Sequence, residues 1–91
     1  MTSGIIHVYR ARALKYMTKK GDWVTSMEIA SVVTGIPVHE IEGMSSVRRE
    51  IQRTYGYRAI MALKEEGLLE EGIVNGHTKK WRLKTAADTQ P

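Results

Sequence analysis

The sequence contains no cysteine and only 2 prolines among its 91 residues. The lack of cysteine excludes a disulfide framework and a thiolate nucleophile, and it favours a cytoplasmic location over a secreted one. The longest uninterrupted apolar run covers only residues 59–63, which is far too short to cross a membrane. We therefore expect a cytoplasmic protein with no membrane partner.

Catalytic and metal-binding motifs are equally scarce. The 3 histidines, His7, His39 and His77, lack the spacing of metal ligands. The sequence has no phosphate-binding glycine loop, no dinucleotide-binding fingerprint and no nucleophile elbow. We therefore expect that the protein is not an enzyme and that it holds no metal or cofactor.

What the sequence does have is an ordinary globular composition with an uneven distribution of positive charge. The 14 Lys and Arg against 10 Asp and Glu give a net charge of +4. The cations gather in two clusters, Arg48, Arg49, Arg53 and Arg58 in the first and Lys79, Lys80, Arg82 and Lys84 in the second. An acidic block separates the clusters, consisting of Glu65, Glu66, Glu70 and Glu71. If the fold brings the two clusters together, they would form one positive face.

The N-terminal segment has the spacing of an amphipathic helix. Ser3 can serve as its N-cap, and Gly21 ends it. Residues at helical spacing would form its apolar stripe, namely Ile5, Ile6, Tyr9, Ala13, Tyr16 and Met17. A basic stripe falls on another side of the same helix, consisting of Arg12, Lys15 and Lys19.

A capping box predicts the start of a second helix. The Thr25 hydroxyl can accept a hydrogen bond from the Glu28 amide, and the Glu28 carboxylate can reach back to the Thr25 amide. Thr34–Gly35 closes this helix, because glycine readily adopts the left-handed conformation found at helix ends. Trp23–Val24, just before the box, is the only candidate for a short extra strand.

The next segment predicts a short helical turn and then a further helix. Pro37 is expected at the first position of the turn, which ends at Gly43. Either Ser45 or Ser46 then caps the following helix. Its apolar stripe would consist of Met44, Val47, Ile51 and Tyr55.

Gly56 allows two interpretations of the region that follows. One long helix over residues 45–66 is an option, because an interior glycine costs only about 1 kcal/mol. Continuous helical phasing would, however, place Arg58 within the apolar stripe and Ile60 outside it. The pattern therefore slightly favours a break or kink at Gly56.

The C-terminal part predicts a β-hairpin after Gly67. Strands are expected at about residues 69–74 and 77–83 around an Asn75–Gly76 turn, the strongest two-residue hairpin signal. A lone hairpin is only marginally stable, so Trp81 is expected to face the core opposite Trp23–Val24. Residues 85–91 have no apolar anchor and are expected to form a frayed, disordered tail.

In this order the segments resemble the winged helix-turn-helix superfamily of prokaryotic DNA-binding regulators. Residues 23–30 (WVTSMEIA) look like its short strand and second-helix start, and Thr34–Gly35 looks like its turn. Residues 63–70 (LKEEGLLE) look like the end of its third helix, and residues 80–83 (KWRL) look like its final wing strand. The resemblance implies a mainly α fold with a small antiparallel β-sheet, residues 1–84 forming one domain. Small bacterial or phage transcription regulators are similar in size.

One departure from the family concerns the middle of the chain. The stretch from Gly35 to Gly67 is longer than the usual turn plus recognition helix. The excess is either a helical insertion at residues 37–43 or an elongated third helix. The start of the recognition helix therefore falls somewhere within residues 36–57.

The resemblance also implies a set of DNA-contacting residues. The third helix would enter the major groove, where arginines read guanine or meet phosphates. The candidates on that helix are Arg48, Arg49, Gln52, Arg53, Tyr57 and Arg58. The candidates on the wing are Lys79, Lys80 and Arg82, and those at the start of the second helix are Thr25 and Ser26. Arg49 and Arg53 are one turn apart and would project together, away from the stripe formed by Val47, Ile51 and Tyr55.

Double-stranded DNA is the partner that these features favour, and sequence-specific binding by a transcription regulator is the expected function. A homodimer is also expected, because a single small reading head covers few base pairs. The alternative is a protein-interaction module, for example a phage protein that binds a host factor. In that case an acidic patch would meet a basic partner, through Glu65, Glu66, Glu70 and Glu71.

Overall fold

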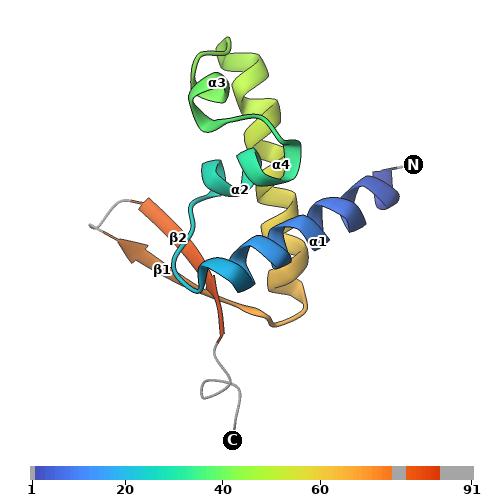
Figure 1. Ribbon diagram of the computed structural model, residues 1–91, viewed down its shortest axis with the longest axis vertical. Helices are drawn as coiled ribbons and strands as arrows, with labels where there is room; N and C mark the ends of the chain where they lie inside the picture. Colours follow the sequence, from blue (N-terminus) through green and yellow to red (C-terminus); the bar gives the residue numbers. More distant parts are fainter. Residues whose placement is uncertain (1, 75–77, 85–91) are drawn as a thin grey trace, which may run out of the picture.

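The computed structural model describes residues 2–74 and 78–84. Its elements follow one another as α1 (Thr2–Lys20), α2 (Ser26–Thr34), α3 (Val38–Glu42), α4 (Ser46–Glu65), β1 (Leu69–Val74) and β2 (Thr78–Leu83) (Figure 1). The fold is mainly helical with a two-stranded antiparallel sheet, in agreement with the coarse fold class predicted from the sequence. The expected turn at Asn75–Gly76 and the expected tail at residues 85–91 lie outside the described residues.

The helix ends follow the local sequence signals closely. Gly21, Gly35 and Gly67 all have positive φ, at 64°, 77° and 75°, and they stand just beyond the helices that they were expected to end. Pro37 occupies the N-cap of α3 rather than its first turn. The N-cap predicted at Ser3 is wrong, because α1 already begins at Thr2 and Ser3 lies within it.

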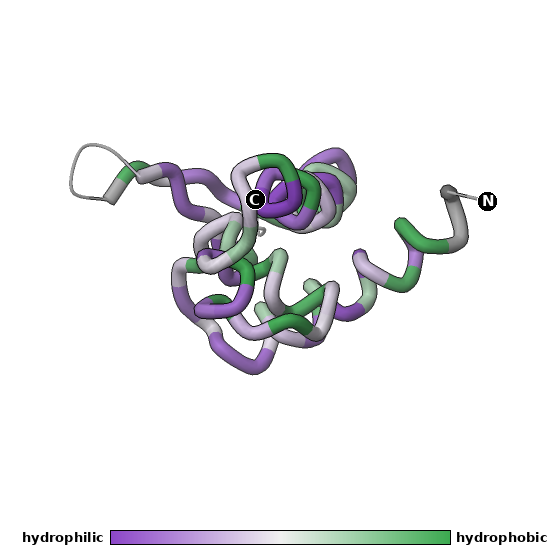
Figure 2. The backbone as a smooth tube through the Cα atoms, turned by 90° about the horizontal axis from the view of Figure 1, so that it is seen from above, coloured by the Kyte–Doolittle hydropathy of each residue, from purple (hydrophilic) through white to green (hydrophobic). Residues whose placement is uncertain are grey.

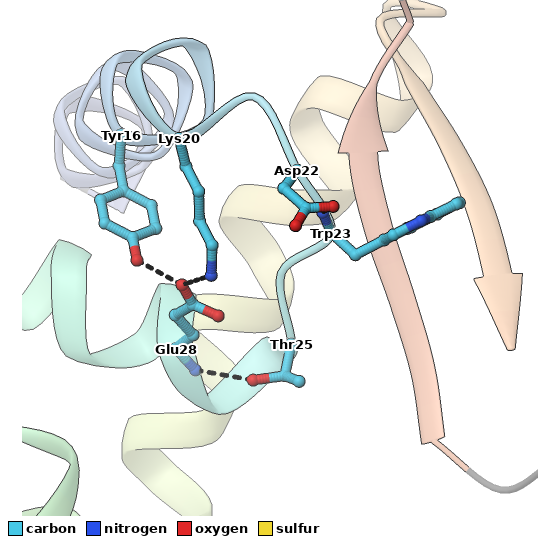
Figure 3. A network of polar contacts seen from close by, with 6 residues as sticks. All are labelled: Tyr16, Lys20, Asp22, Trp23, Thr25 and Glu28. Atoms are coloured by element: carbon cyan, nitrogen blue, oxygen red, sulfur yellow. Dashed lines mark hydrogen bonds and ion pairs between the residues drawn. The ribbon is translucent and has the colours of Figure 1, made fainter. Parts of the chain in front are cut away.

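The start of α2 has the predicted cap and an additional link to α1. Thr25 Oγ1 accepts a hydrogen bond from the Glu28 amide at 3.1 Å. The Glu28 carboxylate accepts hydrogen bonds from the Tyr16 hydroxyl and the Lys20 ammonium group (Figure 3). Burial raises the pKa of Glu28, but the hydrogen bonds from Lys20 and Tyr16 outweigh burial, so the pKa lies below its usual value.

The core lies between α1, α2 and α4, with the hairpin closing one end. Its buried members are Ala13, Met17, Val24, Ile29, Val33, Ala59, Ile60, Leu63, Leu69 and Trp81. Val24 forms an isolated antiparallel bridge with Trp81, in which the Val24 amide donates to the Trp81 carbonyl at 2.8 Å and the Trp81 amide donates back at 3.0 Å. This bridge confirms the extra strand expected at Trp23–Val24, in a minimal form, and ties the hairpin to the helices.

The break favoured at Gly56 is wrong, because α4 is continuous through this residue. Gly56 is buried where α4 crosses α2. A Cβ atom at this position would lie 2.6 Å from the Ala30 amide nitrogen and 2.7 Å from the Ser26 carbonyl oxygen. Gly56 therefore permits the close approach of two helices rather than interrupting one of them.

The apolar stripes predicted for α1 and α4 are only partly buried. Ala13 and Met17 enter the core as expected, but Ile5 is 49% exposed, Ile51 47% and Val47 70%. The N-terminal halves of α1 and α4 extend away from the shared core (Figure 1), and Figure 2 shows the start of α1 standing apart from the other elements. The buried side of α4 is formed instead by Gly56, Ala59, Ile60 and Leu63.

Candidate nucleic-acid interface

A shallow hollow lies where the N-terminus of α2 meets the middle of α4. Ser26 lines it from α2, and Arg53, Thr54 and Tyr57 line it from α4, around a volume of about 210 Å³. The close approach at Gly56 brings these two helices together. Ser26 is the first residue of α2, and the N-terminus of a helix carries a partial positive charge. The hollow therefore combines a helix N-terminus with the positive side chain of Arg53.

One carboxylate also lines this hollow. Glu50 pairs with Arg53 on the same helix, with 3.3 Å between Arg53 Nη1 and Glu50 Oε2. The side chains are 48% exposed for Arg53 and 67% for Glu50. Exposed pairs of this kind contribute little free energy, so a phosphate or a base edge can displace Glu50 at small cost.

The hairpin adjoins the hollow through an aromatic contact. The Tyr57 ring meets the Trp81 ring edge-on, with 6.5 Å between centroids and 75° between planes. Trp81 is only 3% exposed, which confirms that it faces the core. Lys79 alternates with Trp81 along β2 and therefore shares its side of the strand. The pKa of Glu71 is held low by a hydrogen bond from Lys64 of α4, and the charge of Lys79 adds to this effect.

The other face of the hairpin holds Arg82 and Lys80. The Arg82 guanidinium lies 4.4 Å from the centre of the Trp23 ring and pairs with Glu70 on the neighbouring strand. The same indole covers Gly72, where an added Cβ would come within 2.7 Å of the ring. Arg82, a wing candidate, is thus engaged within the fold, and the wing cations are divided between two faces.

The arginines of the first cluster fall on different sides of α4. Arg49 and Arg53 do share a side, but it is the side that continues to Gly56 and α2. Arg49 is half-buried, and its guanidinium donates to the Glu42 carbonyl of α3 at 3.5 Å. Arg48 and Arg58 are exposed, whereas Gln52 is half-buried.

The exposed side of α4 carries a residue that the sequence did not single out. Thr54 is exposed and lines the hollow with Arg53 and Tyr57. It also lines a neighbouring surface depression with Arg58. Its position one turn before Arg58 is the only signal that could have identified it.

The acidic block is largely neutralised within the fold. The Glu66 carboxylate pairs with Arg10, Glu70 pairs with Arg82, and Glu71 pairs with Lys64 at 2.6 Å. These pairs connect α1 with the end of α4, β1 with β2, and α4 with β1. Three of the four carboxylates of this block are therefore paired within the fold, and the acidic patch proposed for a basic partner stays a prediction.

The described residues show neither a metal site nor a membrane-spanning helix. Within residues 2–74 and 78–84, no group of 3 or more His, Asp or Glu side chains is placed to hold a metal ion. No helix in this part of the chain is long and apolar enough to cross a membrane. Comparison with known proteins found no matching family model, no matching curated protein and no matching solved structure.

Proposed function

We propose that this protein binds double-stranded DNA sequence-specifically, as a transcription regulator of winged-helix type. In this proposal α4 is the reading helix, α2 sets its orientation, and the β1–β2 hairpin is the wing. The order of the elements, the bridge between Val24 and Trp81 and the close α2–α4 crossing support this arrangement.

The observation that carries the proposal is the hollow between α2 and α4. It joins the N-terminus of α2 at Ser26 to Arg53, Thr54 and Tyr57 on α4, and Tyr57 contacts the hairpin through Trp81. Helix amides bind phosphate, arginine reads guanine or neutralises phosphate, and a major groove is wide enough to admit one helix. These are the components that a reading helix needs at one place.

We assign the candidate residues different roles according to their exposure and contacts. Arg53 and Arg58, on either side of Thr54, are the base-reading candidates, because both side chains are exposed. Lys79 and Lys80 are the backbone-contacting candidates on the hairpin. Arg49 is half-buried, and Arg82 is held by Trp23 and Glu70, so neither is assigned a direct role in reading bases.

The experiment that tests this proposal is selection of binding sites from random duplex DNA. We expect a sequence motif to be enriched, and its absence even at low salt would overturn DNA binding. At the enriched site, Arg58→Ala or Arg53→Ala should cost roughly 1–3 kcal/mol and relax the preference at one or two base pairs. The matched control is Lys15→Ala on α1, which removes one exposed cation away from the hollow and should leave the affinity unchanged.

The wing has a different expected signature. Replacing Lys79 and Lys80 together by Ala should lower the affinity for cognate and random duplexes to the same extent, because phosphate contacts carry no sequence information. It should also reduce the dependence of affinity on salt concentration. Titrations of both duplexes at several salt concentrations measure this. Unchanged affinities and an unchanged salt slope would show that the hairpin does not touch DNA.

A further inference from the structure

A second cationic surface lies on the other flank of α2. It is a shallow cleft of about 290 Å³ between α1 and α2. Its lining consists of Arg12, Lys15, Tyr16 and Lys19 from α1 and Val32 from α2. These cations are the basic stripe of the first helix, and the proposed DNA interface uses none of them.

Two of the cations in this region are already engaged. Lys20 pairs with Glu28, which also accepts a hydrogen bond from the Tyr16 hydroxyl. Arg12 Nη1 donates to the Val33 carbonyl near the end of α2, at 2.7 Å. Both contacts join α1 to α2 and so fix the two walls of the cleft relative to each other.

Lys15 and Lys19 are different. Both side chains are exposed, and neither makes an ion pair or a hydrogen bond within the part of the chain that the structure describes. The acids in the neighbourhood, Glu28 and Asp22, act on Lys20. Two ammonium groups one helical turn apart therefore border the cleft with their charge uncompensated.

The floor of the cleft is apolar, which limits the ligands that fit it. The floor is formed by the Tyr16 ring, the Val32 side chain and the aliphatic stems of the bordering cations. A DNA backbone offers phosphates but no protruding apolar side chain that could lie on such a floor. A protein segment offers both, when carboxylates flank one apolar side chain.

We propose that this cleft is a docking site for an acidic segment of a partner protein. Carboxylates of the segment would pair with Lys15 and Lys19, and one apolar side chain would lie on Tyr16 and Val32. Val32 faces α1, whereas the Ala30 and Ser26 backbone faces α4, so the cleft and the hollow lie on opposite flanks of α2. A protein bound here would leave the hollow open, and the site does not depend on DNA binding.

The test uses the full chain and a short fluorescent peptide of glutamates and aspartates that carries one leucine. We expect binding, measured by fluorescence anisotropy, and amide NMR shifts concentrated at residues 12–19 and at Val32. Lys15→Glu or Lys19→Glu should weaken binding roughly tenfold or more, because each reverses a charge that faces the peptide. Lys84→Glu makes the same charge change at another exposed lysine and should leave the affinity within about twofold.

Replacing the leucine of the peptide by serine tests the apolar floor without altering the protein. We expect this peptide to bind several-fold more weakly, because it no longer buries apolar area. The proposal is overturned if the leucine peptide does not bind, if serine binds as well as leucine, or if Lys84→Glu weakens binding as much as Lys15→Glu. It is also overturned if Lys15→Glu lowers affinity for random duplex DNA or for anionic lipid vesicles but not for the peptide.

Discussion

The two halves of α4 carry similar apolar side chains in opposite environments. In the C-terminal half, Ile60 and Leu63 are completely buried, whereas in the N-terminal half Val47 is 70% exposed and Ile51 47%. The cause lies beside the helix, because among the described elements α1 and α2 pack over the middle and C-terminal part of α4, whereas the short α3 lies beside its N-terminal end (Figure 1). Apolar spacing thus identifies a face of a helix but not whether another element covers it.

This difference also bears on the proposed function. A helix that reads a major groove must expose side chains away from its own core, and Arg53 and Arg58 on α4 both do so. Gly56, which lies between these two arginines in the sequence, packs closely against α2 and thereby fixes the position of α4. If this difference holds in solution, substitutions in the buried half of α4 should affect stability far more than substitutions in its exposed half.

The largest contrast is expected between Ile60 and Ile51. Ile60→Ala should lower the free energy of unfolding by roughly 2–5 kcal/mol, because it removes buried methyl groups and leaves a cavity. Ile51→Ala makes the same chemical change at a half-exposed position and should cost less than about 1 kcal/mol. Urea denaturation of both variants measures the difference. Equal losses would mean that the exposed half of α4 is covered in solution, for example in the expected homodimer.

The next contrast concerns Gly56 itself. Gly56→Ala should destabilise the fold by roughly 2 kcal/mol or more, because the added methyl group would overlap backbone atoms of α2. The gain in helix propensity offsets only about 1 kcal/mol of this steric cost. Thr54→Ala, two positions earlier on the exposed side, is the matched control and should change stability by less than about 0.5 kcal/mol. A stabilised Gly56→Ala protein would show that the two helices do not approach this closely.

The success of sequence reasoning here depended on whether a feature was local. The Thr25 cap and the helix ends at Gly35 and Gly67 follow from interactions within a few residues, so the local sequence contains them. The interpretation of Gly56 was wrong because this position must be glycine to admit the backbone of α2, which lies more than twenty residues earlier in the chain. A glycine that breaks a helix and one that admits a neighbour look the same in sequence.

The candidate site shows the same limit. The two basic clusters and the two strands of the hairpin were recognisable in the sequence, whereas the start of a recognition helix within residues 36–57 stays a prediction. The sequence did not show which arginines are exposed, because the half-burial of Arg49 beside α3 and the contact of Arg82 with Trp23 arise from the tertiary fold. Those partners are fixed by tertiary packing rather than by spacing along the chain.

The two helix caps give a smaller contrast of the same kind. Thr25→Ala should cost about 1 kcal/mol, because Thr25 caps α2, on which the buried half of α4 rests. Ser45→Ala removes the cap of α4, but its contact to the Arg48 amide is longer, at 3.4 Å, and lies at the exposed end. We expect it to cost roughly 0.5 kcal/mol. Thermal melts of both variants measure the two values, and a larger loss for Ser45→Ala would show that the exposed half is needed for folding.

The smallest effect is a pH dependence of stability that arises at Glu28, in the first turn of α2. Hydrogen bonds from Lys20 and Tyr16 outweigh burial and lower the pKa of Glu28 in the folded state, whereas the unfolded chain retains a value of about 4.3. A lowered carboxyl pKa stabilises the fold above the unfolded pKa, and this stability is lost as the pH falls through the folded pKa. Wild-type protein should therefore lose stability below about pH 5.

Glu28→Gln keeps the shape of this side chain but cannot ionise. We expect it to lower the free energy of unfolding at pH 7 by less than about 1 kcal/mol and to flatten the acid-induced loss, because no charge remains to be protonated. Glu66→Gln is the matched comparison: Arg10 also lowers the pKa of Glu66, but that side chain is 45% exposed against 25% for Glu28. Solvent screens the more exposed pair, so its removal should flatten the pH profile less. Urea denaturation of both variants between neutral pH and pH 3 measures this. The reverse order would mean that the main acid-sensitive contact of the fold is the Arg10–Glu66 pair between α1 and the end of α4, rather than the contacts of Glu28 at the start of α2.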